Sequence, residues 1–349
     1  MKKLRVLVLM HSKLTPPEDV SKLTEQEFLD VKTEHDVLTG LAKLGHEVMP
    51  LGLVDDLGPL RQTTAEWKPD VVFNLLEEFR GETLFDQNVV SYLELMQIPY
   101  TGCNPRGLMI ARDKALSKKI LHYHRIRVPR FAVFPIGKKV LRPRSLGFPL
   151  IVKPQVEEAS TGISEASLVY NDEKLVERVE FVHTTVQSNV IVEEYIDGRE
   201  LYVGLLGNGR VQALPVWELR IDQLRADAPK IATHTVKWNL KYQRRRGVRI
   251  ARAENLPEAL ERELARISKR IYRALELSGY ARIDFRLDAQ ERAYFLEANP
   301  NPDIGFGEEI AAEAHAAGIG YESLLQRILN LGLHHGDVPR RATDAPPAV

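Results

Sequence analysis

The residues with the clearest potential for chemistry lie in the stretch GYARIDFRLDAQERAYFLEANPNPDIG, which begins at Gly279. Two β-type runs separated by a polar turn predict a hairpin. Side chains alternate between the faces of a strand, so Arg282 and Asp284 share one face, and Glu297 and Asn299 share a face of the second strand. A hairpin that brings these groups together offers only oxygen ligands, which suit Mg²⁺ rather than Zn²⁺. The strands are expected at 281–287 and 293–298.

Asp284 alone supports a second interpretation, because charged residues alternate with apolar ones on any half-exposed antiparallel hairpin. The two strands together are more specific. An R-x-D strand followed by a strand ending in E-x-N-x-x-P resembles the metal-binding hairpin of the ATP-grasp superfamily, and most closely its D-alanine–D-alanine ligase branch. The resemblance extends through most of residues 4–333 and implies ATP with one or two Mg²⁺ ions, for which Mn²⁺ could substitute. Asp284, Glu297 and Asn299 are then the expected metal ligands, and Arg282 a catalytic residue.

Further positions match the nucleotide-binding residues of these ligases. Lys114 and Lys153 stand where the family places phosphate-contacting lysines, and a charge at the end of the apolar run 148–152 needs a partner or a polar cleft. Ser160 and Gly162 fall where a phosphate-clamping loop is expected, although Glu158 departs from the usual small residues there.

The segment VIVEEYIDGRE, residues 190–200, resembles the hinge that grips adenine. An edge strand would offer backbone groups to the purine, and apolar side chains would cover its faces. The resemblance implies that Glu193 binds the exocyclic amine and that Glu200 binds the ribose hydroxyls. Backbone contacts from Glu194 and Ile196, with Tyr195 packed nearby, complete the expected set.

The long polar excursion between Trp217 and Pro257 is typical of a functional or disordered segment. In the resembled family it is a lid over ATP with a lysine that reaches the γ-phosphate. Lys237 is the candidate catalytic lysine, followed by Lys241. Closure of such a lid would exclude water from a reactive intermediate.

The elements that must position these residues indicate an α/β protein. Strand, helix and strand alternate along residues 4–75, including one expected helix over 25–44, which favours a parallel sheet covered by helices. The resemblance implies an ATP-grasp fold with a Rossmann-like pre-ATP-grasp lobe. We expect an N-terminal lobe over 1–113, a central ATP-grasp lobe over 114–199, a C-terminal lobe with the metal hairpin over 200–333, and a flexible tail over 334–349.

Composition narrows the classes of function. Lys and Arg total 48, as do Asp and Glu, so no global field favours nucleic acid or a membrane. The single cysteine, Cys103, excludes an intrachain disulfide and suits a reducing compartment. The apolar run 6–10 is too short for a signal peptide and reads as a buried strand. We therefore expect a cytoplasmic protein that binds neither nucleic acid nor membranes.

Family likeness implies ATP-dependent joining of a carboxylic acid to an amine through an acyl phosphate. The loop NPNPDIGFGEE lacks the serine that holds the acceptor's carboxylate in D-alanine–D-alanine ligases and gains Asp303, Glu308 and Glu309. This change predicts an acceptor other than D-alanine and leaves open one with a cationic group; the donor acid is expected at Arg80 or Arg282. Two alternatives use the same scaffold, a peptide-tailoring ligase and a non-catalytic nucleotide-binding protein. A homodimer is a further expectation from the likeness.

Overall fold

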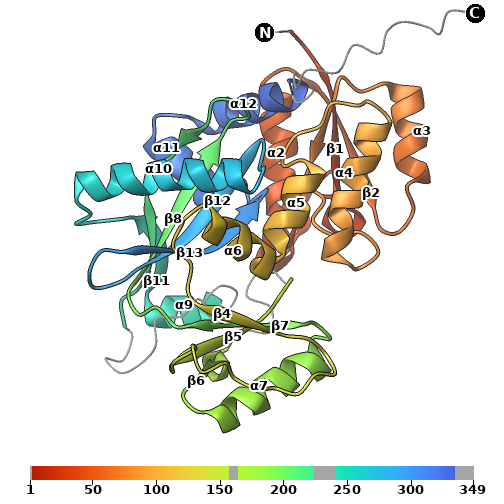
Figure 1. Cartoon of the computed structure of the whole chain (residues 1–349). Helices are drawn as coiled ribbons and strands as arrows, with labels where there is room; N and C mark the ends of the chain where they lie inside the picture. The colour runs from red at the N-terminus through yellow and green to blue at the C-terminus, as the bar shows by residue number, and fades with distance from the viewer. Residues whose placement is uncertain (1, 157–163, 224–239, 335–349) are drawn as a thin grey trace, which may run out of the picture.

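The apolar runs of the sequence form three separate sheets in the computed structural model, which describes residues 2–156, 164–223 and 240–334 (Figure 1). Each sheet belongs to a different part of the chain, and helices cover their faces. Within the described residues, no helix is both long and apolar enough to cross a membrane.

The first sheet is parallel and has the order β2-β1-β3. Residues 6–10 at its centre are fully buried, as expected for a parallel strand covered on both faces. The single helix expected over 25–44 is wrong, because Val31 leaves helical geometry and divides it in two. A capping box between Thr24 and Glu27 stabilises the N-terminus of the first helix. The elements are β1 (Arg5–His11), α1 (Glu25–Asp30), α2 (Lys32–Lys43), β2 (Glu47–Leu53), α3 (Gly58–Trp67), β3 (Val71–Asn74), α4 (Asp86–Leu95) and α5 (Pro105–Arg112).

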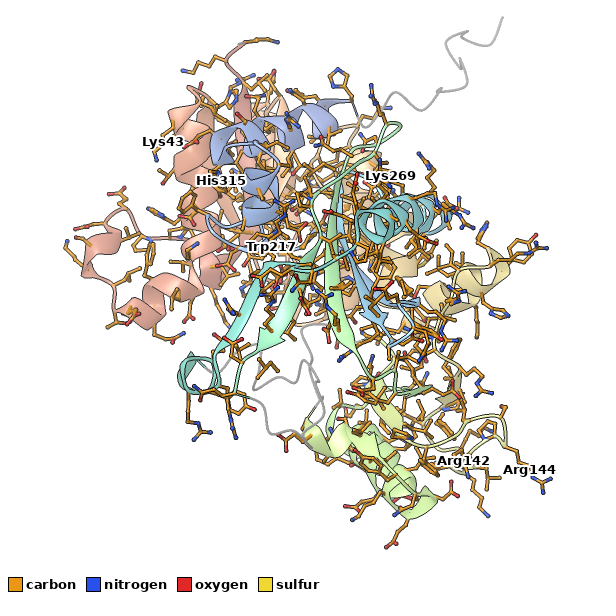
Figure 2. All side chains as sticks on the ribbon, turned by 90° about the vertical axis from the view of Figure 1, so that its left-hand side faces the viewer. Lys43, Arg142, Arg144, Trp217, Lys269 and His315 are labelled. Carbon is orange, nitrogen blue, oxygen red and sulfur yellow. The ribbon has the colours of Figure 1, made fainter. Side chains whose placement is uncertain are left out.

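The second sheet is antiparallel, with the order β4-β7-β5-β6. It has its own hydrophobic core, in which Leu150 and Val192 of the strands pack with Val179 of the covering helix. Figure 2 shows this part at one end of the molecule, with Arg142 and Arg144 at its outer edge. The elements are β4 (Phe131–Phe134), β5 (Leu150–Pro154), β6 (Leu168–Val169), α7 (Asp172–Thr185) and β7 (Val190–Glu194).

The third sheet is also antiparallel and has the order β11-β10-β8-β12-β13, with a short strand, β9, added to β8. A long helix, α10, packs on β8 and β12, and α12 packs against α2 and β3 of the first part. One continuous hydrophobic core joins Leu7 and Leu108 of the first part to Ile271 and Phe285 of the third. The elements are β8 (Arg199–Leu206), β9 (Gln212–Ala213), β10 (Trp217–Ile221), α9 (Leu240–Arg246), β11 (Val248–Arg252), α10 (Glu258–Ala274), β12 (Tyr280–Leu287), β13 (Ala293–Pro300), α11 (Glu309–Ala316) and α12 (Tyr321–Leu333).

One helix, α6 (Lys114–Tyr123), lies where these parts meet. It contacts α5 of the first part and both α10 and β13 of the third. Asp113 caps its N-terminus by accepting hydrogen bonds from the amides of Ala115 and Leu116. The cap fixes the first residue of the helix, Lys114, against the third sheet.

Candidate active site

The predicted hairpin is confirmed, and its register brings the four polar side chains together. Asp284 of β12 lies opposite Glu297 of β13, and Arg282 lies opposite Asn299. The register then shifts, so that Phe285 faces Phe295 and Leu296 has no partner across the ladder. Such a bulge bends a strand and changes the direction of its side chains. Here it directly follows the Asp284–Glu297 pair.

Arg282 is a buried cation whose guanidinium is fixed by acids. Its Nε and Nη2 donate to the two carboxylate oxygens of Asp284 at 2.8 and 2.9 Å, and its Nη1 donates to Glu309 at the start of α11. The ring of Tyr202 lies 4.7 Å from the guanidinium carbon. Burial opposes the charge, but Asp284 outweighs burial and raises the pKa of Arg282 above its ordinary value. The cation is therefore permanent and pre-oriented.

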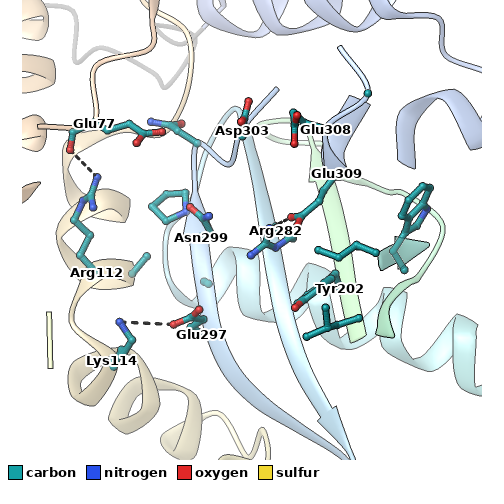
Figure 3. A pocket seen from close by; sticks show the side chains of 18 of the residues that line it. Glu77, Arg112, Lys114, Tyr202, Arg282, Glu297, Asn299, Asp303, Glu308 and Glu309 are labelled. Atoms are coloured by element: carbon teal, nitrogen blue, oxygen red, sulfur yellow. Dashed lines mark hydrogen bonds and ion pairs between the residues drawn. The ribbon is translucent and has the colours of Figure 1, made fainter. Parts of the chain in front are cut away.

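Arg282 lines a cavity of about 480 Å³ that also exposes Lys114, Glu297 and Asn299. Figure 3 shows Lys114 pointing across the cavity at Glu297, and the two ends of this ion pair are 3.6 Å apart. Lys114 and Glu297 come from α6 and β13. The fold thus brings a lysine predicted to contact phosphate to a carboxylate predicted to bind metal.

The three predicted metal ligands suit a hard cation that completes its coordination with water or substrate oxygens. Within the described residues, no three His, Cys, Asp or Glu side chains come close enough to hold a metal by themselves. Asp284, Glu297 and the amide oxygen of Asn299 form a donor set of oxygens only; Glu297 and Asn299 line the open cavity, and Asp284 is buried behind them, opposite Glu297 and bonded to Arg282. Mg²⁺ usually keeps several waters and binds one or two carboxylates plus substrate phosphates. The donor set therefore fits Mg²⁺ bound together with a nucleotide.

A second charged cluster joins β5 and β7 of the second sheet to α6. The Glu193 carboxylate is fully buried, 3.2 Å from Lys153 Nζ and 3.0 Å from Lys118 Nζ. Burial alone would raise the pKa of Glu193, but the two ammonium groups outweigh it and lower that pKa. Burial lowers the pKa of Lys118, whereas Glu193 and other acids raise that of Lys153 against the effect of burial. We take Glu193 to be ionised, because two lysines share it.

Sequence analysis did not identify Lys118. It also donates to the carbonyl of Leu296, the residue of the bulge, and its Nζ lies 5.3 Å from the centre of the Phe295 ring. Lys118 therefore ties the bulged strand to Glu193 and Lys153. The available signal was its position four residues after Lys114, since side chains at i and i+4 share one face of a helix.

The segment predicted to bind adenine is placed differently from the prediction. The strand Val190–Glu194 is not an edge strand, because it lies between β4 and β5 and pairs with both. The amide of Glu194 donates to the Arg130 carbonyl, and the amide of Tyr195 donates to the Pro149 carbonyl. Both donors are thus used within the protein, and Ile196 is the first predicted residue beyond the paired backbone. The Glu194 carboxylate pairs with Arg130.

Glu200 is buried at the start of β8 and is satisfied within the protein. Its carboxylate accepts a hydrogen bond from the hydroxyl of Tyr202 at 2.8 Å and pairs with Arg286 at 2.8 Å. It lines a small cavity of about 240 Å³. Glu200 is therefore placed beside a cavity, as a ribose-binding acid must be. The predicted Ser160, Gly162 and Lys237 lie outside the described residues.

Acidic side chains also line the cavity that contains Arg282, at the end away from Lys114. Asp303 and Glu308 lie there, and Glu309 lies between them and Arg282 (Figure 3). Arg80, expected at the donor acid, is exposed and is not among the residues that line this cavity. Cys103 is buried, as expected for a cysteine without a catalytic role.

The chain is similar to known proteins over most of its length. The family model described as D-ala D-ala ligase C-terminus matches residues 125–330. An uncharacterized protein of Sinorhizobium fredii is 32% identical over 309 residues, which cover 84% of this chain and 85% of the relative. The D-alanine–D-alanine ligase of Aquifex aeolicus is 31% identical over 328 residues, 93% of this chain and all of the relative.

Among solved structures, a D-alanine–D-alanine ligase from Bacillus anthracis complexed with ATP superposes with a TM-score of 0.73. It is 25% identical in sequence, and the match covers 95% of this chain and 98% of that one. The family model alone covers more than half of this chain, and both the relatives and the solved structure extend the match to the remaining N-terminal part. The chain therefore belongs to the D-alanine–D-alanine ligase-like family of the ATP-grasp superfamily.

Proposed function

We propose that this chain is an ATP-dependent carboxylate–amine ligase that activates its acid as an acyl phosphate and uses an acceptor other than D-alanine. The observation that carries the proposal is the meeting of Lys114, Glu297 and Arg282 in one cavity. Phosphoryl transfer needs fixed cations around the phosphates, and acyl transfer needs a donor for the oxyanion. Lys114 and Arg282, which could serve these two needs, line the same cavity.

The residues divide between the two halves of the reaction. In the first, a carboxylate oxygen of the acid attacks the γ-phosphorus of ATP, and ADP leaves. Lys114 and Lys153 would bind phosphate oxygens, with Lys237 as the proposed lysine of the lid. Asp284, Glu297 and Asn299 would hold Mg²⁺, which when bound would neutralise negative charge on the phosphates.

In the second half, the amine attacks the acyl carbon, a C–N bond forms and the C–O bond to phosphate breaks. The amine releases a proton, and inorganic phosphate leaves with the oxygen that came from the acid. Arg282 would donate to the oxyanion of the tetrahedral intermediate. Its hydrogen bonds to Asp284 orient the guanidinium before substrate arrives, so little reorganisation is needed during the reaction.

Nucleotide recognition would come from the segment after β7. Glu193 is enclosed between two lysines, so the adenine amine could reach its carboxylate only past them. Ile196 and the following backbone lie beyond the paired strand and would be easier for the base to reach. Glu194 and Tyr195 would frame the base, and Glu200 would meet the ribose. Ser160 and Gly162 remain the proposed phosphate clamp.

The acceptor is the part in which this chain differs from ligases that join two D-alanines. An acceptor carboxylate placed between Arg282 and α11 would face Asp303 and Glu308, which also line the cavity. Like charges at close range disfavour binding. D-Alanine should therefore be a poor acceptor, even though several relatives bear the name D-alanine–D-alanine ligase.

The test is phosphate release from ATP in a screen of acids and amines, followed by isotope transfer. With an acid labelled by ¹⁸O in its carboxylate, an acyl phosphate route delivers one labelled oxygen to the released phosphate. Release that requires both acid and amine excludes a non-catalytic nucleotide-binding protein. Unlabelled phosphate would exclude the acyl phosphate, and robust turnover of D-alanine alone would refute the altered acceptor.

A further inference from the structure

An acidic corner closes the end of the cavity away from Lys114. It is built by the start of α2 and by the loop between β13 and α11. Thr33 donates its hydroxyl to Asp303 at 2.7 Å, and Lys32 lies 2.9 Å from Asp36 and 3.8 Å from Glu308. The amide of Phe306 also donates to Asp36 at 2.9 Å. These contacts join the first and third parts of the fold and hold the carboxylates in place.

Among the residues that the structure describes, negative charge exceeds positive charge at this corner. Glu34 joins Asp36, Asp303 and Glu308, and Lys32 is the lysine paired with them; His35 lies beside Asp36, with 3.6 Å between ring nitrogen and carboxylate. Glu34 is 5% exposed, and the donor to its carboxylate among the described residues is its own amide. Within the part of the chain that the structure describes, Lys32 and His35 are the basic side chains paired with acids of this corner.

The electrostatics of the corner agree with a shortage of cations. Burial and, to a lesser degree, the charge of Asp303 raise the pKa of Glu34 to about 7. The same two causes raise the pKa of Glu308, against the opposing effect of Lys32. A cation close to a carboxylate lowers the pKa of that carboxylate. The corner would thus be stabilised by a further positive group.

The other cations that line the cavity are held elsewhere. Arg112 pairs with Asp86, Arg249 with Asp222, and Arg282 with Asp284 and Glu309, while Lys114 pairs with Glu297. A bare metal ion is not the expected occupant, because no three acids within the described residues come close enough to hold one. An organic cation needs only hydrogen bonds to one or two carboxylates.

We propose that the acceptor amine carries a second, protonated amino or guanidino group, and that Asp303 and Glu308 receive it. The inference rests on the proposed function, because it places the nucleophilic amine beside Arg282 and the second cation at the acidic corner (Figure 3). Only the attacking amine has to lose its proton in the reaction. The second group keeps its charge and fixes the orientation of the acceptor. The acceptor class is therefore a diamine, or a basic amino acid whose second cation offsets the unfavourable carboxylate that D-alanine presents without such a cation.

Isosteric pairs of acceptors test the inference. Lysine is compared with norleucine, and ornithine with norvaline, in the acid- and ATP-dependent release of phosphate by the full chain. A charge-assisted hydrogen bond predicts that kcat/KM is about 10- to 100-fold higher for the cationic member of each pair. Glu308→Gln and Asp303→Asn should remove most of this preference, and Glu308→Lys should shift it toward acceptors with a side-chain carboxylate. Glu258→Gln, in an exposed acid of α10, is the matched control and should keep it.

Binding of lysine, measured by calorimetry on the full chain and on Glu308→Gln, separates the two possible failures. Ligase turnover without a preference for the cationic member, or a preference that survives in Glu308→Gln, overturns the inference and leaves the proposed function intact. Absence of turnover with any pair refutes the proposed function. In that case, lysine binding that Glu308→Gln abolishes still supports the cation site, and absence of binding refutes it as well.

Discussion

Replacing Glu193 by Gln would leave two lysine ammonium groups in the interior without the carboxylate that they share. Lys118 and Glu193 are fully buried, and Lys153 is 8% exposed. Removing one partner of a buried ion pair typically destabilises a protein by about 3–5 kcal/mol, because the remaining charge is desolvated without compensation. We expect a loss in this range for Glu193→Gln, partly reduced if Lys118 releases its proton.

The effect should depend on pH in a defined direction. The lysines hold the pKa of Glu193 below its ordinary value, so the stabilisation is fully present above the pKa of the unfolded chain, about 4.3. It is lost as the pH falls through the lower pKa of the folded state. The difference in unfolding free energy between wild type and Glu193→Gln should therefore be constant at neutral pH and shrink below about pH 4.

Urea unfolding followed by circular dichroism measures this difference, with the exposed Glu177→Gln as a matched control on the neighbouring helix α7. The double variant Lys118→Met/Glu193→Gln removes one orphaned charge and should be more stable than Glu193→Gln alone. A loss below about 1 kcal/mol for Glu193→Gln, or losses that simply add in the double variant, would refute the shared buried network.

Three further outcomes follow from the structure. Burial raises the pKa of Glu313 to about 8, so the folded state holds a proton that the unfolded chain releases above about pH 4.3. The stability of Glu313→Gln relative to wild type should therefore rise by a few kcal/mol between about pH 5 and pH 8. A difference that does not change with pH in urea titrations would contradict this. Gly198→Ala places a Cβ 1.9 Å from the carbonyl oxygen of Leu287 at a φ of +148°, so its urea midpoint should fall, whereas Gly209→Ala, which meets nothing within 4 Å, should change little. Arg282→Lys should lower the rate of phosphate release per folded molecule at least ~100-fold, because a lysine cannot bridge Asp284 and the reacting oxygen as a guanidinium can. Its urea midpoint should also fall, since buried Asp284 loses the bidentate contact, and near wild-type turnover would exclude the proposed role.

The hairpin was predictable because its information is local. A period of two assigns Arg282 and Asp284 to one face, and the polar turn sets which residues of the second strand oppose them. The meeting of Lys114 with Glu297 is not local, since it depends on α6 packing against β13. The prediction that Lys114 belongs to the site came from the resemblance to the family, because the periodicity of the sequence does not show which elements pack together.

The same distinction explains the incorrect prediction for Val190–Glu194. A strand order of β4-β7-β5 is a property of the whole sheet, and no feature of one strand specifies its neighbours. The uninterrupted apolar run Val190–Val192 was the available hint, because a strand buried on both faces lacks alternation. Lys118 illustrates the opposite case, in which a residue type that is usually exposed is buried by tertiary packing.

The acidic corner was partly visible in the sequence. Asp303, Glu308 and Glu309 are close together along the chain, and their number indicated an unusual acceptor site. Their division of roles became apparent only in three dimensions, where Glu309 pairs with Arg282 while Asp303 and Glu308 face α2. Acids adjacent in sequence thus serve different parts of one cavity.

The central claim is that Glu297 belongs to a magnesium-dependent phosphoryl-transfer site, and the rate of acid- and amine-dependent phosphate release by Glu297→Gln tests it most directly. The side chain is 32% exposed, whereas its partner Lys114 is 5% exposed, so the unfolding midpoint of Glu297→Gln is measured beside the rate. We predict a rate at least ~100-fold below wild type and a requirement for a higher Mg²⁺ concentration. A wild-type rate with a wild-type dependence on Mg²⁺ would contradict it.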